Sequence, residues 1–292
     1  MSSADQIQRF IFDDADVRGV LVGLDQSYHD CLDRHQYPQP VKQLLGQMLA
    51  AVSLLSSTLK FEGRLSLQAR GDGAVSLLMA ECTRQNHLRA IAQVNADIDG
   101  EDLVELLGKG QLAITIEPEK GQRYQGLVPL EHPQLAQCLE QYFAQSEQLA
   151  TRIMLAADER TASGMLLQAL PSNDQGERYQ ENWARIDHLG STLTLKELQE
   201  LDNETLLFRL FHEEQVRLYE SNDLVFKCDC SKERCMRALL SLGEEELQQM
   251  QQEQQGSVAI DCQFCNSRYE VDPVELEQLR RGGSTAASDQ VH

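Results

Sequence analysis

The sequence predicts an α+β protein with an N-terminal domain of antiparallel sheet and helices, a helical linker, and a small C-terminal four-cysteine domain. Short apolar segments alternate with turn residues as far as Pro171. A polar stretch with helical spacing follows. Cys228, Cys230, Cys262 and Cys265 then form two short clusters. The expected parts are residues 1–175, 176–227 and 228–281, followed by a disordered tail over 282–292.

The first elements are two strands, a short helix and a long helix. Apolar positions recur through residues 7–24 around an Asp-rich turn, which predicts a strand pair. A short helix is expected over 28–35, halted by Pro38 and Pro40. Residues 41–59 predict a long helix, and its apolar part is shorter than the ~20 residues that cross a membrane. We therefore expect a buried core helix.

Residues 62–82 predict a β-hairpin with its turn at Gly71-Asp72-Gly73. The same glycines could be half of a phosphate-binding loop. That loop would need a third glycine followed by Lys-Ser/Thr, and both are missing. The turn is the better interpretation. The remaining elements of this domain are predicted as strands over 88–94, 112–117, 153–157 and 165–170 and helices over 101–107 and 133–148.

The linker is predicted to be helical and only marginally stable. Residues 177–227 contain 11 acidic and 6 basic side chains, and Thr194 with Glu197 forms a capping-box pattern. Such a polar helix must pack its apolar side against a neighbouring element to be stable. An ordinary pair of connecting helices is an equally open interpretation of these residues. The apolar stripe of the linker consists of Leu201, Leu206, Leu207, Leu210, Phe211 and Val216.

The C-terminal part is too small and polar to rely on a hydrophobic core. Helices are expected over 235–242, over 244–255 and after Pro273. A unit of ~55 residues usually needs a staple. Four thiolates can hold a tetrahedral zinc ion, and alternation in extended chain lets both sulfurs of a Cys-x-Cys pair face it. One zinc ion per chain is therefore predicted, bound by Cys228, Cys230, Cys262 and Cys265.

The zinc site has two possible roles. It could be a purely structural knuckle. It could also be a redox switch, because zinc-bound thiolates are nucleophiles that oxidants attack. Loss of the metal would then unfold the small domain. Lys232, Arg234 and Arg268 lie beside the clusters in the sequence and could favour the thiolate form.

The other four cysteines are expected to be structural. Cys235 is interpreted as a buried helix residue facing Leu239, with a spare metal ligand as the alternative. Cys31, Cys82 and Cys138 fall among apolar neighbours and are predicted core residues.

Composition and missing motifs exclude several classes. The net charge of −20 disfavours nucleic-acid binding. The N-terminus lacks the pattern of an export signal, so a cytoplasmic location with reduced cysteines is expected. No nucleophile elbow, phosphate loop or His-Glu-x-x-His helix is present, and His212-Glu213-Glu214 lacks the second histidine. The sequence therefore predicts no enzyme.

The run Phe226–Cys235, with Cys262-Gln263-Phe264-Cys265-Asn266 downstream, resembles the bacterial heat shock protein 33 family over the full chain. This resemblance implies an ATP-independent chaperone of the holdase type, inactive when reduced and zinc-bound. It further implies activation by two disulfides, Cys228–Cys230 and Cys262–Cys265, with zinc release and linker unfolding. The implied partners are unfolding client proteins and a second copy of the chain in the oxidised state, without nucleotide, nucleic acid or membrane.

We further hypothesise that the stripe around Leu206, Leu207, Leu210 and Phe211 covers, or becomes, an apolar client site. Two competing classes remain. A zinc-ribbon adaptor with a purely structural metal should carry basic and aromatic surface, which the charge argues against. A thiol-disulfide oxidoreductase would place Cys-x-x-Cys at a helix N-terminus and lack a second cysteine pair.

Overall fold

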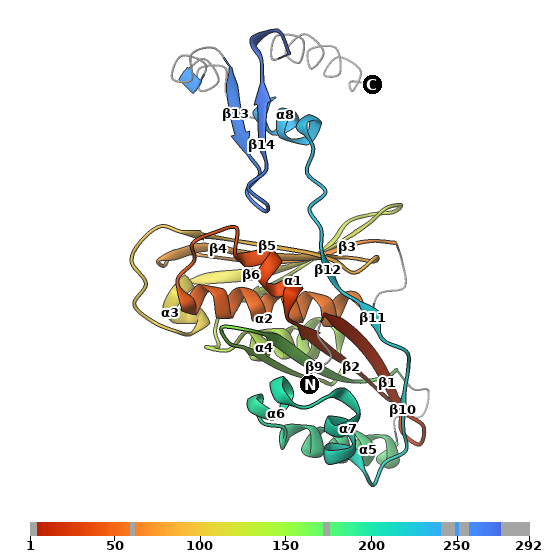
Figure 1. Ribbon diagram of the computed structural model, residues 1–292. Coiled ribbons are helices and arrows are strands. Elements are labelled where there is room, and N and C mark those ends of the chain that lie inside the picture. Colours follow the sequence, from red (N-terminus) through yellow and green to blue (C-terminus); the bar gives the residue numbers. More distant parts are fainter. Residues whose placement is uncertain (1–4, 59–61, 172–175, 241–248, 251–256, 276–292) are drawn as a thin grey trace, which may run out of the picture. The chain divides into compact units, whose positions relative to one another are not determined.

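The computed structural model describes residues 5–58, 62–171, 176–240, 249–250 and 257–275. The chain divides into two compact units, Met1–Lys227 and Cys228–His292. In the first unit, two six-stranded sheets enclose a helical layer, and further helices cover the outer face of one sheet (Figure 1). The second unit contains a two-stranded sheet and a helix. The predicted α+β class is confirmed.

The first sheet is built on the strand pair predicted near the N-terminus. Strands β1 (Gln6–Phe12) and β2 (Val17–Leu24) pair antiparallel around the Asp-rich turn. Alternation gives the sheet two apolar faces: Ile7 packs on one side, and Phe10 and Phe12 pack on the other. The strand order is β10-β1-β2-β9-β8, and β11 also pairs with β1. The partner strands are β8 (Thr151–Ala157), β9 (Ala162–Ala169), β10 (Val216–Leu218) and β11 (Asn222–Asp223).

The second sheet contains the predicted hairpin, and its turn glycines serve packing. A Cβ added to Gly71 would lie 1.9 Å from the Leu107 carbonyl oxygen, and one added to Gly73 would lie 2.5 Å from that of Leu106. Close backbone approach therefore explains both glycines. The strand order is β12-β5-β4-β3-β6-β7. The strands are β3 (Gly63–Gly71), β4 (Val75–Thr83), β5 (His87–Val94), β6 (Gly110–Pro118), β7 (Tyr124–Pro129) and β12 (Val225–Phe226).

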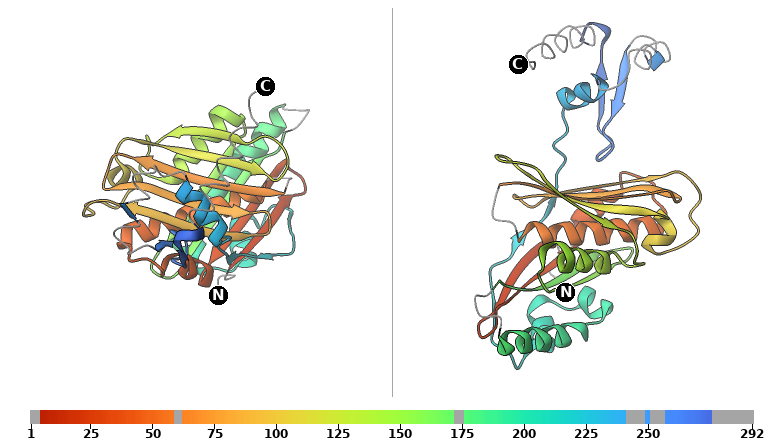
Figure 2. Two further views of the ribbon diagram at one scale, coloured as in Figure 1. Left: turned by 90° about the horizontal axis from the view of Figure 1, so that it is seen from above. Right: turned by 180° about the vertical axis from the view of Figure 1, so that it is seen from behind.

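The long predicted helix, α2 (Gln39–Ser56), lies between the two sheets (Figure 2). Nearly all of its side chains are buried, as predicted. It begins two residues before the predicted start, because Pro40 is tolerated in the first helical turn. The predicted end at Leu59 lies outside the described residues. The other helices of this part are α1 (Gln26–Leu32), α3 (Leu103–Leu107), α4 (Leu135–Tyr142) and the π-helix η1 (Phe143–Glu147).

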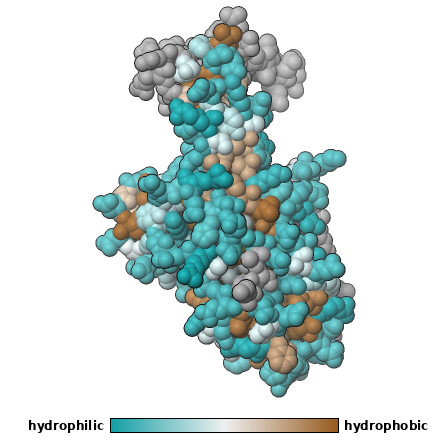
Figure 3. Space-filling view, viewed as in Figure 1, coloured by the Kyte–Doolittle hydropathy of each residue, from teal (hydrophilic) through white to brown (hydrophobic). Residues whose placement is uncertain are grey.

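Three linker helices cover the outer face of the first sheet, in the lower part of Figure 1. They are α5 (Glu177–Ser191), α6 (Leu195–Glu200) and α7 (Asn203–Phe211). The predicted capping box is present: the Glu197 backbone N–H donates to the Thr194 hydroxyl at 3.2 Å, and the Thr194 N–H donates to the Glu197 carboxylate at 3.0 Å. The visible surface is mostly hydrophilic, in keeping with the net charge of −20 (Figure 3).

The prediction of helix throughout the linker is wrong after Phe211. Residues 216–226 instead form β10, β11 and β12. Val216 and Leu218 alternate with polar residues, and they pair with the open edge of β1. Val225 and Phe226 pair in parallel with β5. The unpaired backbone N–H and C=O groups at the edges of the two sheets therefore form hydrogen bonds with this segment. Strands of two or three residues are too short to show a periodic pattern in the sequence.

The second unit has a minimal apolar core. Helix α8 (Lys232–Leu240) begins three residues before the prediction, and the unpredicted strands β13 (Val258–Asp261) and β14 (Arg268–Val271) form a hairpin. Its buried cluster consists of Leu239, Val258 and Val271, with three partly buried neighbours. Among the described residues, this core is far smaller than those of the first unit. The predicted helix over 244–255 and tail over 282–292 lie outside the described residues, apart from 249–250.

Candidate metal centre

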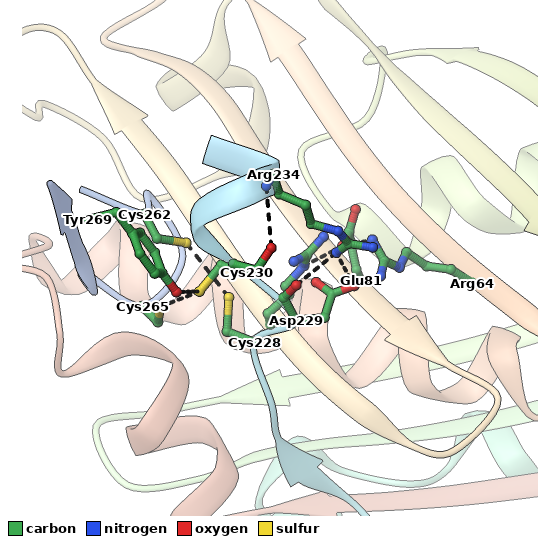
Figure 4. Close-up of polar contacts among 11 residues, drawn as sticks. Arg64, Glu81, Cys228, Asp229, Cys230, Arg234, Cys262, Cys265 and Tyr269 are labelled. Carbon is green, nitrogen blue, oxygen red and sulfur yellow. Dashed lines mark hydrogen bonds and ion pairs between the residues drawn. The ribbon is translucent and has the colours of Figure 1, made fainter. Parts of the chain in front are cut away.

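Two short segments bring the four predicted cysteines together. Cys228 and Cys230 lie in irregular chain just before α8, and Cys262 and Cys265 lie in the tight turn between β13 and β14 (Figure 4). The Asn266 N–H donates to the Cys262 carbonyl at 2.7 Å and closes this turn. Asn266 has φ 55°, a left-handed conformation that asparagine tolerates better than most residues.

The four sulfur atoms form one cluster that fits a tetrahedral metal. All four Sγ atoms lie within 4.8 Å of one another. Cys228 Sγ lies 3.7 Å from Cys262 Sγ, and Cys230 Sγ lies 3.3 Å from Cys265 Sγ. Zinc–sulfur bonds of about 2.3 Å in a tetrahedron require sulfur separations of about 3.8 Å. The described residues therefore provide a donor set of the right chemistry and nearly the right spacing for a metal ion.

Electrostatics at the cluster favour a central cation. Burial raises the pKa of the Cys228 thiol, and it also raises that of Cys230 despite an opposing hydrogen bond from Tyr269. Burial acts against the charged form of Cys265 too, but hydrogen bonds with Ser267 and the neighbouring thiols outweigh it and lower the pKa of Cys265 to about 7. Four thiolates in this space repel one another, and a divalent cation at their centre would offset that repulsion.

Two residues that sequence reasoning missed surround the sulfurs. The Tyr269 hydroxyl lies 3.1 Å from Cys230 Sγ (Figure 4). The Ser267 hydroxyl lies 3.2 Å from Cys265 Sγ. Both belong to the chain leaving the Cys262–Cys265 turn. Neither residue had a clear signal in the sequence, because the left-handed Asn266 interrupts extended chain between Cys265 and Ser267.

The predicted basic neighbours instead form ion pairs with carboxylates. Lys232 Nζ lies 2.6 Å from the Glu275 carboxylate. Arg234 pairs with the Asp229 carboxylate and also donates to the Asp229 carbonyl at 2.9 Å. A third pair joins Arg268 to Asp261 at 4.0 Å. Each of these cations therefore has a carboxylate partner that offsets part of its charge, and their effect on the thiolates stays a prediction.

The other cysteines lie outside the four-sulfur cluster. Cys235 is buried on α8, one helical turn before Leu239. Cys31, Cys82 and Cys138 are buried in the core around α2, as predicted. Burial raises the pKa of all three thiols, which favours their neutral form.

The predicted client stripe is covered in this structure. Its four residues are buried and pack on the outer face of the first sheet. The Phe211 ring meets the Phe12 ring edge-on at 5.0 Å and lies 6.5 Å from the Phe10 ring. Phe208, on the same helix, is 73% exposed. The client stripe is the part of the linker's apolar stripe that lies on α7, and it consists of Leu206, Leu207, Leu210 and Phe211.

Comparisons with known proteins match almost the whole chain. The family model described as Hsp33 protein covers residues 5–272. A protein of Pseudomonas aeruginosa (strain LESB58) named 33 kDa chaperonin is 52% identical over 297 residues, with both chains fully covered. A protein of the same name from Azotobacter vinelandii is 51% identical over 291 residues, which cover 98% of each chain.

The fold also matches a solved structure. The crystal structure of the 33 kDa chaperonin (heat shock protein 33 homolog) of Thermotoga maritima aligns with a TM-score of 0.81 and 24% identity, covering 96% of this chain and 99% of its own. None of the helices in the described part of the chain combines the length and apolar character needed to cross a bilayer. Since the family model and full-length relatives match from end to end, the chain belongs to the Hsp33 family.

Proposed function

We propose that this protein is an ATP-independent holdase whose activity is switched by the oxidation state of its four clustered cysteines. The observation that carries the proposal is the four-sulfur cluster, in a unit whose described residues bury only a small apolar cluster. The relatives of the chain are named chaperonins. The reduced, metal-bound protein is inactive. The oxidised protein binds unfolding proteins and prevents their aggregation. It acts in the cytoplasm, on clients rather than nucleic acids, nucleotides or membranes.

Zinc is the metal that best suits the cluster. Soft thiolates arranged as a tetrahedron select zinc among the common divalent cations. Cys228, Cys230, Cys262 and Cys265 would hold it, which leaves no open position for a substrate. When bound, the metal supplies folding free energy to the second unit and keeps the four sulfurs as thiolates.

Oxidation removes the ligands in pairs. Each pair of thiolates loses two electrons as one S–S bond forms. These electrons, together with two protons from the solvent, reduce one hydrogen peroxide molecule to two water molecules. We propose the pairs Cys228–Cys230 and Cys262–Cys265. The two sulfur contacts of 3.7 and 3.3 Å run between the segments, so geometry in the reduced state does not select these pairs. Cysteines in disulfides no longer provide thiolate ligands. The second unit then loses the metal ion that stabilises its fold.

The linker is the element that responds. Lys227 and Cys228 are consecutive, so unfolding of the second unit frees the end of the linker. In this structure, the apolar stripe of the linker is buried against the outer face of the first sheet. Undocking would expose Leu206, Leu207, Leu210, Phe211 and their partners on the sheet as an apolar surface for clients. The oxidised form is proposed to act as a homodimer.

The decisive experiment measures aggregation of a thermally unfolding client in the presence of the protein, with and without prior peroxide and mild heat. Zinc release is followed in the same sample. We expect protection only after oxidation, with about one zinc released per chain, as a single four-thiolate site requires. Peptide mapping should find Cys228–Cys230 and Cys262–Cys265. Zinc release without gain of client protection would show that the cysteines have only a structural role. Disulfides that join Cys228 or Cys230 to Cys262 or Cys265 would overturn the assigned pairing.

Tyr269 is expected to tune metal affinity. The variant Tyr269→Phe removes the hydroxyl 3.1 Å from Cys230 Sγ and keeps the ring. Loss of such a supporting contact typically weakens metal binding about tenfold. Competition with a chromogenic chelator measures the change. Glu270→Gln, on the same strand and exposed, is the matched control; equal zinc affinity in both variants would show that the hydroxyl has no role.

A further inference from the structure

Two adjoining cavities in the first unit share Arg9 and Ser57 in their walls. They lie beyond the C-terminal end of α2, on the face of β1 and β2 that α2 covers elsewhere. One cavity has a volume of about 310 Å³ and is also lined by Arg84 and Asn222. The other has a volume of about 350 Å³ and is also lined by Arg18. The first cavity has a mainly polar wall, the second has polar and apolar parts of similar extent, and arginine side chains line both.

Strand register places Arg9 beside Arg18, and Arg84 shares the wall of the first cavity with Arg9. Arg9 pairs with Val20 and Ile11 pairs with Arg18, so Arg9 and Arg18 are diagonal neighbours on one sheet face. Arg84 comes from the turn between β4 and β5. Within the described part of the chain, the side chains of Arg9 and Arg84 form no hydrogen bond or ion pair. We call Arg9, Arg18 and Arg84 the arginine cluster.

Arg18 has an unsatisfied buried donor. Its Nη2 donates to Gln168 Oε1 at 2.6 Å, but its buried Nε has no hydrogen-bond partner among the described residues. Burial lowers the pKa of Arg18, and the nearby charge of Arg9 lowers it further. Buried donors in native proteins are almost always paired with protein, ordered water or ligand, so this Nε is available to a partner from outside the described chain.

A structural explanation for the arginine cluster is the C-terminal end of α2, since the partial negative charge of a helix C-terminus attracts cations. However, the last carbonyls of the helix already have other donors: the Ser57 hydroxyl donates to the Leu54 carbonyl and the Thr58 hydroxyl to the Leu55 carbonyl, both at 2.7 Å. The nearby Glu62 carboxylate accepts from Gln85 at 3.0 Å. No described carboxylate pairs with the arginine cluster, in a chain with a net charge of −20.

We propose that the arginine cluster is a binding site for a diphosphate group. A guanidinium group can donate two parallel hydrogen bonds to phosphoryl oxygens. The two adjoining cavities share Arg9 in their walls and provide room for two phosphoryl groups. Inorganic pyrophosphate and a nucleoside diphosphate both carry this group, and either would be a bound ligand, distinct from the clients on which the holdase acts. Tyr219 and Asn222 line the cavities from the linker, so a bound diphosphate would connect that segment to β1.

Calorimetric titration of the reduced, zinc-loaded full chain tests the proposal. Sodium pyrophosphate is the first probe and ADP the second, at constant ionic strength, with zinc content measured afterwards because pyrophosphate also binds metals. We expect saturable 1:1 binding of pyrophosphate. Arg9→Gln and Arg84→Gln should each weaken it about tenfold, as expected for the loss of one charge-assisted contact. Both side chains are exposed, so these variants should fold normally.

Arg160→Gln is the matched control, since Arg160 is exposed in the turn between β8 and β9 and its loss changes the net charge equally. It should bind as the wild type does. Binding of pyrophosphate alone would identify an inorganic ligand, and competition by ADP a nucleotide. Hydrogen exchange should slow at residues 216–223 on binding. Unchanged affinity in Arg9→Gln and Arg84→Gln, protection confined to other segments, or no binding of either probe would overturn the proposal.

Discussion

Replacing Cys262 with serine is expected to abolish stable zinc binding and unfold the second unit. A serine hydroxyl remains protonated where a thiol becomes a thiolate, so the site loses one of its four charged ligands. Metal binding contributes roughly 10–16 kcal/mol to the folding of comparable small domains. The apolar cluster of Leu239, Val258 and Val271 cannot replace that contribution. Zinc affinity should fall at least about a hundredfold, more than loss of a supporting contact causes.

Metal analysis and hydrogen exchange measure the two effects. Amides of residues 257–271 should exchange rapidly in Cys262→Ser, while those of α2 keep wild-type protection. Cys138→Ser and Cys235→Ser are the controls, because both cysteines are buried outside the sulfur cluster. Both should retain one zinc ion. A Cys262→Ser protein with bound zinc and a protected β13–β14 hairpin would contradict the assigned ligand set.

The same variant tests the coupling between the metal site and chaperone activity. Under the proposed switch, loss of the second unit frees the linker whether zinc is lost by oxidation or by mutation. Cys262→Ser should therefore protect a client without peroxide. An inactive variant with an unfolded second unit would separate the two events and indicate that the disulfides themselves are required.

The four-sulfur cluster was predictable because each of its two cysteine pairs is local in the sequence. Cys-x-Cys and Cys-x-x-Cys each state their own geometry, and a soft four-sulfur set leaves few candidate metals. Tyr269 and Ser267 were harder to find, since their role depends on a strand of four residues with little periodic signal. The ion pairs beside the cluster were not predictable either: Arg234 is near the sulfurs along the chain, and only the structure shows that it pairs with Asp229.

Long-range pairing explains most of what the sequence could not predict. The stripe on α7 indicates that a partner surface exists, but nothing local identifies Phe10 and Phe12, which lie about two hundred positions earlier. The arginine cluster combines two strands and a turn, and each arginine alone resembles an ordinary surface residue. Segments such as β11 and β12 are two residues long, and only the sheet edges they meet determine their structure.

Phe211→Ala is expected to activate the protein while leaving its metal in place. The substitution removes the ring that contacts Phe10 and Phe12. Truncating a buried phenylalanine lowers the free energy of unfolding by about 3–5 kcal/mol. A polar linker with one apolar stripe has little stability to lose. Residues 177–211 should exchange amide hydrogens faster, and the reduced protein should suppress client aggregation with one zinc still bound.

Phe208→Ala is the matched control, because it makes the same change on the same helix at a side chain that is 73% exposed. It should remain inactive until oxidised. If Phe211→Ala shows faster exchange in the linker but no client protection, linker undocking is insufficient for activity. If it protects clients as Cys262→Ser does, the metal centre acts only by holding the linker in place, and the client surface belongs to the first unit and its linker.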